Sequence, residues 1–462
     1  MSKKSLDDPG PGPTKVYLSN LSEDVWSFIG SMSPADRLHE IAENAFLSDR
    51  DILTCSSWSH GILIVPQTID PNFAQYCQEV FGFSDLQILV PAHHTGELCL
   101  DVLSDKNCYQ TLLTIGKTTP LELTSYSASP QFYELVSRLT AAGVQVSLPE
   151  SPAPSASWTP NFFGSKSGFR QLISQLSHHK PFPHMSHGYI SFGIRETAKI
   201  ASHMYQKYGG VVIKTTKGHS GAGVMIIPPG SMPTDPPALI AGITQKLQAE
   251  KYWSLFPTII EKFVDIDSTV GGGNPNVELM VDADGIVHSL YFCGMRVTAA
   301  GVFKGVEIHR SALSKKLVKQ LEAIGQLVGQ AYARAGYVGY FDIDGVVSKS
   351  GELFLAESNV RKTGGTHVYH AIKTVIGDGF LDEVFVVSNN VYSLPNSPAS
   401  PIASFAELRD KLRPVLFNHT TKSGVILASA NLLAQQKIAY LVIGPTKKAT
   451  LKTEAEMEKL LH

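Results

Sequence analysis

The sequence predicts a mixed α/β and α+β protein, with a doubly wound α/β domain at the N-terminus, a β-rich central domain and a small α/β domain at the C-terminus. Three observations support this fold class. Short apolar runs alternate with helix-like stretches up to residue 148, which is typical of a parallel α/β sheet. Apolar runs then follow one another closely between 211 and 292, which indicates a β-rich region. Residues 149–157 contain three prolines and few hydrophobic side chains, which predicts an inter-domain linker.

Composition excludes several classes of protein. Of the 462 residues, 43% are hydrophobic and 17% are charged, which is enough to fill several cores and too apolar for a disordered chain. The 39 Lys and Arg nearly balance the 41 Asp and Glu, which excludes a strongly basic nucleic-acid binder. The five cysteines form no Cys-x-x-Cys pair, the chain starts with a polar proline-rich stretch, and no apolar run is long enough for a bilayer. We therefore expect a cytoplasmic protein with no membrane partner.

The N-terminal region begins with a proline-rich polar stretch at 1–14, which we expect to be a disordered tail. The domain at 15–157 is expected to contain strands at 16–18, 62–65, 87–90 and 144–146 and amphipathic helices at 72–81 and 132–142. No Gly-x-Gly-x-x-Gly follows the first of these strands, so a dinucleotide site there has no support.

The central region, 158–376, is expected to start with helices at about 165–177 and 195–208. Its predicted strands lie at 211–214, 223–227, 258–261, 277–281 and 287–292. A long helix at 314–335 then precedes two more strands, at 338–347 and 352–359. In the C-terminal domain, 377–462, we expect helices near 404–412 and 454–461 and a strand at 440–443.

A glycine-rich loop between two β-branched runs is the first candidate site. The loop holds Gly218, Gly221 and Gly223, and glycine lets backbone N–H groups approach an anion closely. Lys214 ends the first run and Lys217 opens the loop, which gives mobile cations suited to a polyphosphate. An ordinary hairpin with a flexible tip and a solvent-facing lysine fits the same pattern.

A hairpin with acidic residues is the second candidate site. If 349–350 are the central turn residues, Asp342 lies directly opposite Glu357, and a register shifted by two keeps the same faces. Asp344 shares the face of Asp342, and Asn359 shares that of Glu357. Opposed carboxylates repel each other, and hard oxygen ligands around an open position suit Mg²⁺. The alternative is an exposed polar hairpin face.

Two weaker features accompany these sites. An apolar strand ends in Glu261 and turns into a connection, where the backbone of 262–264 could read the edge of a base. Any strand-to-loop transition has this appearance, so the feature is weak alone. Arg361 follows Asn359 by two residues and would bind an oxyanion or pair with one of the carboxylates.

The order of these motifs over about 160–375 resembles the ATP-grasp ligases. The order is a lysine before a helix in Gly-Ser-Lys166-Ser-Gly, Val-Ile-Lys214 with its glycine loop, Ile-Ile-Glu261-Lys-Phe, a long helix, and Asp342 followed by Glu357-Ser-Asn-Val-Arg361. Together with the flanking domains, the chain is similar to the pheganomycin-type peptide ligases. The resemblance implies a pre-ATP-grasp domain at 15–157, an ATP-grasp domain at 158–376 with a lid subdomain at about 190–258, and a characteristic C-terminal domain.

The resemblance also implies roles for single residues around the nucleotide. Its phosphates would contact two lysines and the mobile loop, namely Lys166, Lys214, Lys217, Gly218, Ser220, Gly221 and Gly223. Its adenine would contact the hinge formed by Glu261, Lys262, Phe263 and Val264. The ribose would be held by an acidic residue after the hinge, Asp265 or Asp267, of which Asp267 is our choice.

The metal and catalytic roles follow from the same resemblance. Mg²⁺, with Mn²⁺ as an alternative, would be held by Asp342, Glu357 and Asn359, although this family often has Glu where this chain has Asp342. Arg361 would stabilise the transferring phosphoryl group or the acyl intermediate. Arg296 lies where several members of the family keep an arginine that binds a phosphate or a carboxylate.

The activity implied is ATP-dependent ligation of a carboxylate to an amine through an acyl phosphate, with release of ADP. The substrates would be a small acid and an amino acid or peptide in natural-product assembly, and a homodimer is compatible with this class of ligase. Two alternatives stay open. One is another ATP-grasp chemistry, such as carboxylation or thioester formation, and the other is a non-catalytic ATP-binding regulatory module.

Overall fold

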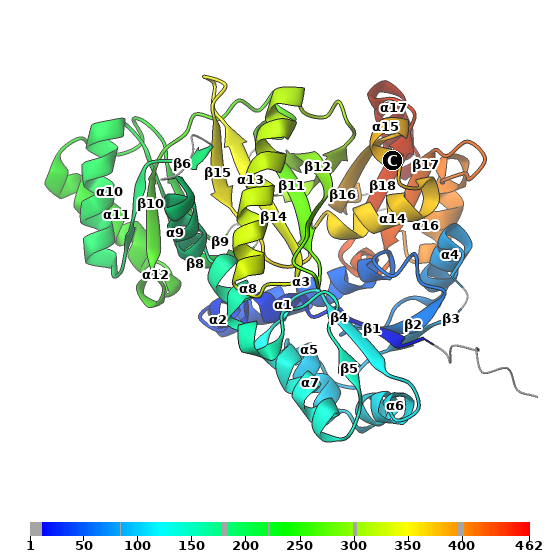
Figure 1. The fold of residues 1–462 in the computed structure, drawn as a ribbon. Coiled ribbons are helices and arrows are strands. Elements are labelled where there is room, and N and C mark those ends of the chain that lie inside the picture. The colour runs from blue at the N-terminus through cyan, green and yellow to red at the C-terminus, as the bar shows by residue number, and fades with distance from the viewer. Residues whose placement is uncertain (1–11, 84, 178–182, 220–221, 299–302, 396–401) are drawn as a thin grey trace, which may run out of the picture.

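The computed structural model describes residues 12–83, 85–177, 183–219, 222–298, 303–395 and 402–462. Their strands form three sheets, of five, four and nine strands. Figure 1 shows the nine-stranded sheet at the centre, the four-stranded sheet at one side and the five-stranded sheet below them. The predicted tail up to residue 11, Ser220 and Gly221 lie outside the described residues.

The N-terminal sheet is parallel, with the order β3-β2-β1-β4-β5. Alternate residues of β1 pack on opposite faces: Val16 and Leu18 on one, Tyr17 on the other. The sheet therefore carries helices on both faces, as the doubly wound prediction requires. The strands are β1 (Thr14–Leu18), β2 (His60–Ile64), β3 (Asp85–Leu89), β4 (Leu121–Ser125) and β5 (Val146–Ser147). The helices are α1 (Leu21–Asp24), α2 (Trp26–Ile29), α3 (Pro34–Leu47), α4 (Pro71–Phe81), α5 (Leu98–Ser104), α6 (Lys106–Gly116) and α7 (Pro130–Ala141).

The four-stranded sheet is antiparallel, with the order β7-β10-β8-β9. Helices α10 and α11 pack their apolar side chains against it (Figure 1). This unit, 188–262, overlaps the residues expected to form a lid at about 190–258 and includes the whole of β10 as well. Its elements are β7 (Gly188–Ser191), α10 (Ile194–Tyr208), β8 (Val211–His219), β9 (Ala222–Ile227), α11 (Pro236–Gln248), α12 (Tyr252–Leu255) and β10 (Thr258–Lys262).

The nine-stranded sheet has the order β17-β18-β16-β13-β12-β11-β14-β15-β6. Helix α13 begins at the cap residue Ser314 and packs its apolar side chains on β11 and β14. The strands are β6 (His184–Met185), β11 (Pro275–Val281), β12 (Val287–Val297), β13 (Phe303–Ile308), β14 (Gly339–Val347), β15 (Leu353–Glu357), β16 (Phe385–Ser393), β17 (Gly424–Ser429) and β18 (Lys437–Gly444). The helices are α8 (Trp158–Phe163), α9 (Lys166–Ser177), α13 (Lys315–Arg334), α14 (Thr366–Ile376), α15 (Phe380–Glu383), α16 (Phe405–Leu412) and α17 (Lys447–Leu461).

The C-terminal segment 377–462 does not form a sheet of its own. Strand β16 pairs with β13, and β18 and β17 follow, so this segment extends the sheet of the central region. The predicted linker at 149–157 connects the N-terminal and central regions, but it is packed rather than free. It contains the 3-10 helix η2 (Pro154–Ala156), and Ser151 is buried. None of the helices in the described ranges has the length and apolar composition needed to cross a membrane.

Candidate active site

Strands β14 and β15 bring the predicted acidic residues together. Asp344, not Asp342, pairs with Glu357, so the predicted register was wrong by two residues. The turn is one residue longer than predicted, with Gly351 at φ 78°, and a bulge follows Asp344. Because side chains alternate along a strand, the two-residue error left the predicted faces unchanged.

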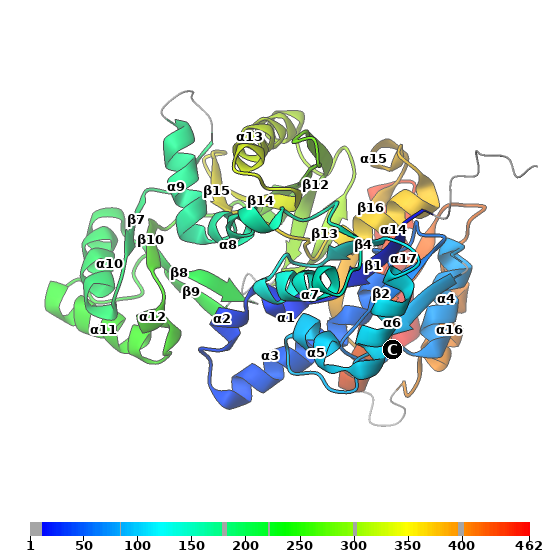
Figure 2. The same ribbon diagram turned by 60° about the horizontal axis from the view of Figure 1, so that its bottom comes forward.

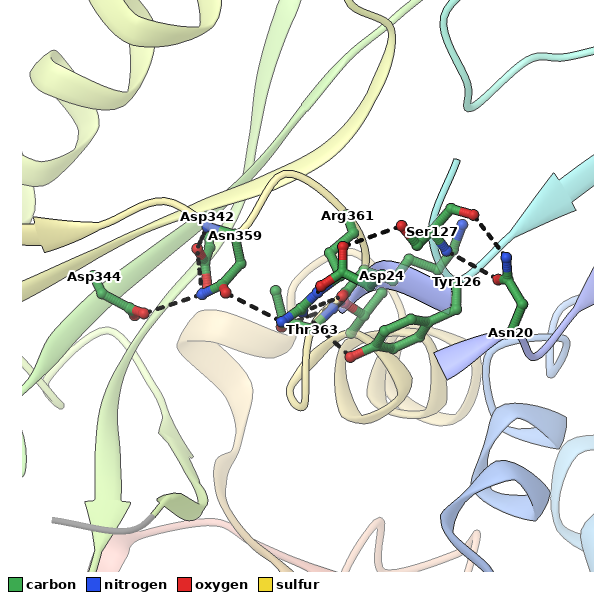
Figure 3. Close-up of polar contacts among 11 residues, drawn as sticks. Asn20, Asp24, Tyr126, Ser127, Asp342, Asp344, Asn359, Arg361 and Thr363 are labelled. Carbon is green, nitrogen blue, oxygen red and sulfur yellow. Dashed lines mark hydrogen bonds and ion pairs between the residues drawn. The ribbon is translucent and has the colours of Figure 1, made fainter. Parts of the chain in front are cut away.

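Two amide side chains hold the carboxylates of Asp342 and Asp344 in place. Asn276 of β11 donates from Nδ2 to Asp342 Oδ2 at 3.0 Å and to Asp344 Oδ1 at 2.6 Å. Asn359 Nδ2 donates to Asp342 Oδ1 at 3.1 Å and to Asp344 Oδ2 at 3.1 Å, as Figure 3 shows. The Asn359 backbone N–H also donates to Asp342 Oδ1 at 2.7 Å. Asp342 is therefore the more fully bonded of the two acids.

The charges in this cluster do not balance. Burial raises the pKa of Asp342 well above its usual value, and the neighbouring Asp344 charge raises it further. Burial and the Glu357 charge raise the pKa of Asp344 to about 7. Burial opposes ionisation of Glu357 as well, but the charge of Lys166, with those of Lys214 and Arg361, outweighs burial and lowers the pKa of Glu357. A bound cation would lower the cost of ionising Asp342 and Asp344 beside the charged Glu357.

The donor set fits a hard divalent cation such as Mg²⁺. Carboxylate and amide oxygens are its usual protein ligands, and it takes one or two carboxylates together with substrate phosphates. Among the residues that the structure describes, no three His, Cys, Asp or Glu side chains group as a complete metal site. The arrangement therefore resembles an open site of two carboxylates and an amide. Asp344 was noted in the sequence but not chosen, and only the true register brings it opposite Glu357.

Two lysines lie near this cluster, and the charges of both lower the pKa of Glu357. Lys166, the first residue of α9, places Nζ 2.6 Å from Glu357 Oε2. Lys214 of β8 places Nζ 2.8 Å from Glu261 Oε2, and Arg170 binds the other oxygen of that carboxylate. Arg170 was missed in the sequence, although it lies one helical turn after Lys166 on the same face of α9.

Mutual attraction keeps Lys214 and Glu261 charged although burial disfavours the charge on each. Burial opposes ionisation of Lys214, but the Glu261 carboxylate outweighs it and raises the pKa of the lysine. Burial likewise opposes ionisation of Glu261, which Lys214 and Arg170 overcome, so the pKa of Glu261 is lowered.

The glycine loop needs its glycines for space. A Cβ on Gly218 would lie 2.5 Å from the Ala222 carbonyl oxygen. Gly223 has φ 81°, and a Cβ there would lie 2.3 Å from Thr215 Oγ1. Burial lowers the pKa of Lys217, Asp24 opposes this effect, and the charges of Lys166 and Arg361 add to it. An anion bound beside Lys217 would therefore favour the charged form of this lysine and offset the repulsion from Lys166 and Arg361.

The β8–β9 hairpin lies against the N-terminal region, as Figure 2 shows for β8, β9 and α2. Phe28 of α2 is fully buried between Tyr252 and Phe256, with ring centroids 5.0 and 6.1 Å away. Ala222, at the start of β9, packs on the same apolar cluster. The hairpin that carries Lys214 and Lys217 is thus held against the N-terminal region.

Arg361 lies where the N-terminal and central regions meet (Figure 3). Its Nε is 2.7 Å from Asp24 Oδ2, and its guanidinium donates to Asn359 Oδ1 at 3.1 Å and to the Tyr126 hydroxyl at 3.3 Å. Asp24 and Tyr126 were not predicted, because no local sequence pattern links residues that are hundreds of positions away from Arg361. The arginine that follows the acidic hairpin is therefore oriented by the N-terminal domain.

The predicted hinge borders a cleft of about 1420 Å³. Lys262, Phe263 and Val264 line it, together with parts of α9, β7 and the β14–β15 turn. The N–H groups of Lys262 and Phe263 donate to the carbonyls of His187 and Gly210 at 2.8 and 3.2 Å. A base in this cleft would therefore be read by other groups of the hinge.

The acidic residues after the hinge stand apart from the buried cluster. Asp265 lines the cleft and pairs with Lys349 at 2.9 Å, and both side chains are exposed. Asp267 accepts hydrogen bonds from the N–H and hydroxyl of Thr269 at 3.0 and 2.6 Å. Asp267 is not among the residues that line the cleft, and the choice of Asp267 stays a prediction.

Arg296 is used by the C-terminal region instead. It donates to both carboxylate oxygens of Glu454, at 2.7 and 3.1 Å, and to the Ser388 carbonyl at 3.1 Å. None of its hydrogen bonds to described residues reaches the acidic cluster, so its geometry is that of a structural ion pair.

The arrangement of the three sheets defines the fold of the chain. The chain has the ATP-grasp fold, with a parallel N-terminal sheet, a four-stranded sheet and a large sheet that carries the acidic hairpin. Among solved structures, it is similar to an ADP complex of N5-carboxyaminoimidazole ribonucleotide synthetase, with a TM-score of 0.52, 11% identity and coverage of 97% of this chain and 96% of the other. Biotin carboxylase from Campylobacter jejuni gives a TM-score of 0.55 with 10% identity, covering 96% and 90%. The carboxyaminoimidazole ribonucleotide synthase of Aspergillus clavatus in complex with ATP gives 0.52 with 11% identity, covering 97% and 98%.

These similarities establish the fold, since the identities are too low to establish more. No protein-family model and no curated protein matches the sequence.

Proposed function

We propose that the chain is an ATP-dependent ligase that joins a carboxylate to an amine. One observation carries the proposal: Lys166 of α9 pairs with Glu357 beside Asp344, the charge of Lys214 in β8 acts on the same carboxylate, and Arg361 binds the neighbouring Asn359. A polyphosphate with a bound metal ion needs both kinds of group, because carboxylates hold the metal ion and positive side chains hold the phosphates. The ATP-grasp fold and the nucleotide complexes of its similar structures add support.

Asp344, Glu357 and Asn359 would hold Mg²⁺, or Mn²⁺ in its place, and Asp342 would support them through Asn359 and Asn276. When bound, the cation neutralises charge on the nucleotide phosphates. Asp342 was our sequence-based choice of ligand. We now favour Asp344 in its place, because Asp344 is the residue that pairs with Glu357.

The reaction needs alignment and charge neutralisation more than covalent help from the protein. A substrate carboxylate oxygen attacks the γ-phosphorus, the bond to the β–γ bridging oxygen breaks, and ADP leaves. The amine then attacks the acyl carbon, phosphate leaves with the bonding pair, and the ammonium proton passes to solvent. Lys166, Lys214 and Lys217 would hold the phosphates, and Arg361 would bind the oxygens of the group in transfer.

For the substrates, we propose a small acid and an amino acid or peptide, in natural-product assembly. The resemblance to pheganomycin-type peptide ligases carries this finer proposal. The five cysteines are all buried and unpaired, which favours the reducing cytoplasm as its compartment. A homodimer remains compatible with the proposal.

Carboxylation is the second candidate. It is favoured by the names of the similar structures, which are a biotin carboxylase and two carboxyaminoimidazole ribonucleotide synthetases. Under this alternative, ADP release would depend on bicarbonate and would continue without any added organic acid. Ligation of an organic acid predicts the opposite dependence.

The test is release of ADP from ATP and Mg²⁺ with pooled acids, amino acids and peptides, together with mass spectrometry of condensation products. We expect Glu357→Gln to lower turnover by about a hundredfold or more. Glu134→Gln on α7 is the control, because that side chain is 45% exposed and lies outside the site. Release of AMP, or full turnover by Glu357→Gln, would reject the proposal.

A further inference from the structure

Phe28 of α2 joins the N-terminal region to the unit that carries two of the proposed phosphate-binding lysines. Its side chain is fully buried, and its ring contacts those of Tyr252 and Phe256, with centroids 5.0 and 6.1 Å away. Tyr252 begins α12 and Phe256 follows that helix, so both rings belong to the unit of the four-stranded sheet. A residue of the first domain is therefore buried largely by side chains of another.

The same ring packs against the β8–β9 hairpin, of which the structure describes 211–219 and 222–227. Ala222 packs on the apolar cluster that contains Phe28, and a Cβ added to Gly223 would lie 3.4 Å from Phe28 Cε2, an ordinary van der Waals distance. Helix α2 also lies beside β8 (Figure 2). Aromatic contacts of this kind stabilise by more than the area they bury. The ring therefore holds the start of β9 against the N-terminal region.

The position in which Phe28 holds the hairpin also brings two lysine-bearing elements together. Ser167 follows Lys166 at the start of α9, and Thr216 precedes Lys217 in β8. The hydroxyls of Ser167 and Thr216 form a hydrogen bond of 2.6 Å, and the Ser167 backbone N–H donates to Thr216 Oγ1 at 3.3 Å. In this position, each of the two lysines is therefore next to a residue of the bonded pair.

We infer that Phe28 is a positioning residue for the phosphates of the nucleotide, because it holds the β8–β9 hairpin where the lysines of β8 meet them. A ligand that must first order its own site binds more weakly, by the fraction of time that the site is formed. By packing on the hairpin before the nucleotide arrives, Phe28 lowers that cost. The inference rests on the proposed function, because it assigns the phosphates to Lys214 and Lys217.

The base and the phosphates should respond differently to the loss of this contact. Lys262, Phe263 and Val264 line the cleft at the hinge, and none of them belongs to the cluster around Phe28. A nucleoside without phosphates would use the hinge alone, whereas a triphosphate would use the hinge and the hairpin. Loss of the Phe28 contact should therefore weaken the triphosphate and spare the nucleoside, whereas a general loss of structure would weaken both.

The test is equilibrium binding of the full-length protein to the magnesium complex of a non-hydrolysable ATP analogue and, separately, to adenosine. Phe28→Ala should weaken the analogue about tenfold or more and change the affinity for adenosine by less than about twofold. Phe28→Leu keeps most of the apolar bulk, so it should weaken the analogue less. Phe192→Ala is the matched control, because that phenylalanine follows β7 in the same unit but is 64% exposed.

A second variant removes the contact from its other side. Phe256 is only partly buried, so Phe256→Ala keeps the inference testable if Phe28→Ala fails to fold. It should weaken the analogue and spare adenosine in the same way. Combining the two changes should add little to the effect of either, because both remove one shared contact. Fully additive losses would contradict a shared contact.

Hydrogen exchange separates this inference from the proposed function. Without nucleotide, amides of 211–219 and 222–227 should exchange about tenfold faster or more in Phe256→Ala than in the wild type, while amides of β14 keep their rates. Unchanged exchange in the hairpin would overturn the inference, as would equal weakening of the analogue and adenosine. Failure of the wild type to bind the analogue counts against the proposed function instead, because the exchange experiment contains no nucleotide.

Discussion

Asp344→Asn should make the nucleotide-free protein more stable while it removes turnover. The carboxyl is buried, and burial together with Glu357 raises its pKa from 3.8 to about 7. Because the folded protein holds this proton more tightly than the unfolded chain does, stability falls as pH rises from about 4 through 7. That difference in pKa between the unfolded and the folded protein corresponds to about 4 kcal/mol at pH 8, where the wild type is ionised.

Asparagine removes that cost but loses an interaction. Two amide groups donate to Asp344, from Asn276 and Asn359, and an asparagine can accept only one of them well. The unsatisfied donor costs about 1–3 kcal/mol. We therefore expect a net gain of about 1–3 kcal/mol in the free energy of unfolding at pH 8, and no gain at pH 4.

Urea unfolding at both pH values measures this difference, and release of ADP measures turnover. Asp284→Asn in the turn after β11 is the control, because it changes an exposed acid outside the site and should leave turnover unchanged. If Asp344→Asn is no more stable than the wild type at pH 8, the repulsion inferred for this cluster is absent. If it keeps normal turnover, Asp344 holds no metal.

Three other variants test separate parts of the structure. Lys214→Ala should lower turnover about a hundredfold or more, since it removes a preorganised charge beside Glu261, and ADP release measures it. Arg296→Gln should cost about 1–3 kcal/mol in urea unfolding by leaving Glu454 without its ion pair. A large loss of turnover at unchanged stability would instead restore the catalytic role predicted for Arg296. Burial raises the pKa of Asp49 to about 6, so ionising this group in the folded wild type costs stability as pH rises from 4 to 7. Asp49→Asn should therefore gain up to about 3 kcal/mol in the free energy of unfolding over the wild type across that range. A difference between the two proteins that stays constant with pH would contradict the raised pKa.

Local sequence patterns were sufficient for much of the fold. The apolar run at 62–65 and the long amphipathic stretch at 314–335 became β2 and α13, because each buries a continuous apolar surface. Strand β4 was missed, since its sequence Leu-Glu-Leu-Thr-Ser is too polar to stand out. It is nevertheless held between β1 and β5 by tertiary pairing.

In the candidate site too, features set by neighbouring residues could be predicted, whereas contacts between distant parts of the chain could not. The faces of the acidic hairpin followed from the alternation of side chains, but its register depended on one extra turn residue and a bulge. Glycine at 351 signals a turn without fixing its length. The partners of Arg361 could not be predicted, because Asp24 is 337 positions away along the chain.

If the chain is the proposed ligase, the fold places the loops beside Arg361 in a different sheet from the groups that would hold the nucleotide. Strands β2 and β4 lie on opposite sides of β1, so the chain reverses its winding direction between β1 and β4. In open parallel sheets, ligands bind where the loops beyond the carboxyl ends diverge at this point. Asn20 after β1 and Ser127 after β4 are joined there by hydrogen bonds of 2.9 and 3.1 Å, beside Tyr126 (Figure 3).

The acidic hairpin belongs to the nine-stranded sheet, Lys214 and Lys217 belong to the four-stranded sheet, and Lys166 begins α9. Changes in the loops after β1 and β4 can therefore alter what lies beside Arg361 while the groups proposed to hold the nucleotide stay in place. Exchanging those loops for ones of different charge should change which acid or amine is accepted and leave the affinity for the ATP analogue within about threefold. If the exchange weakened the analogue as much as it changed substrate preference, the two functions would be coupled through Arg361 rather than divided between sheets.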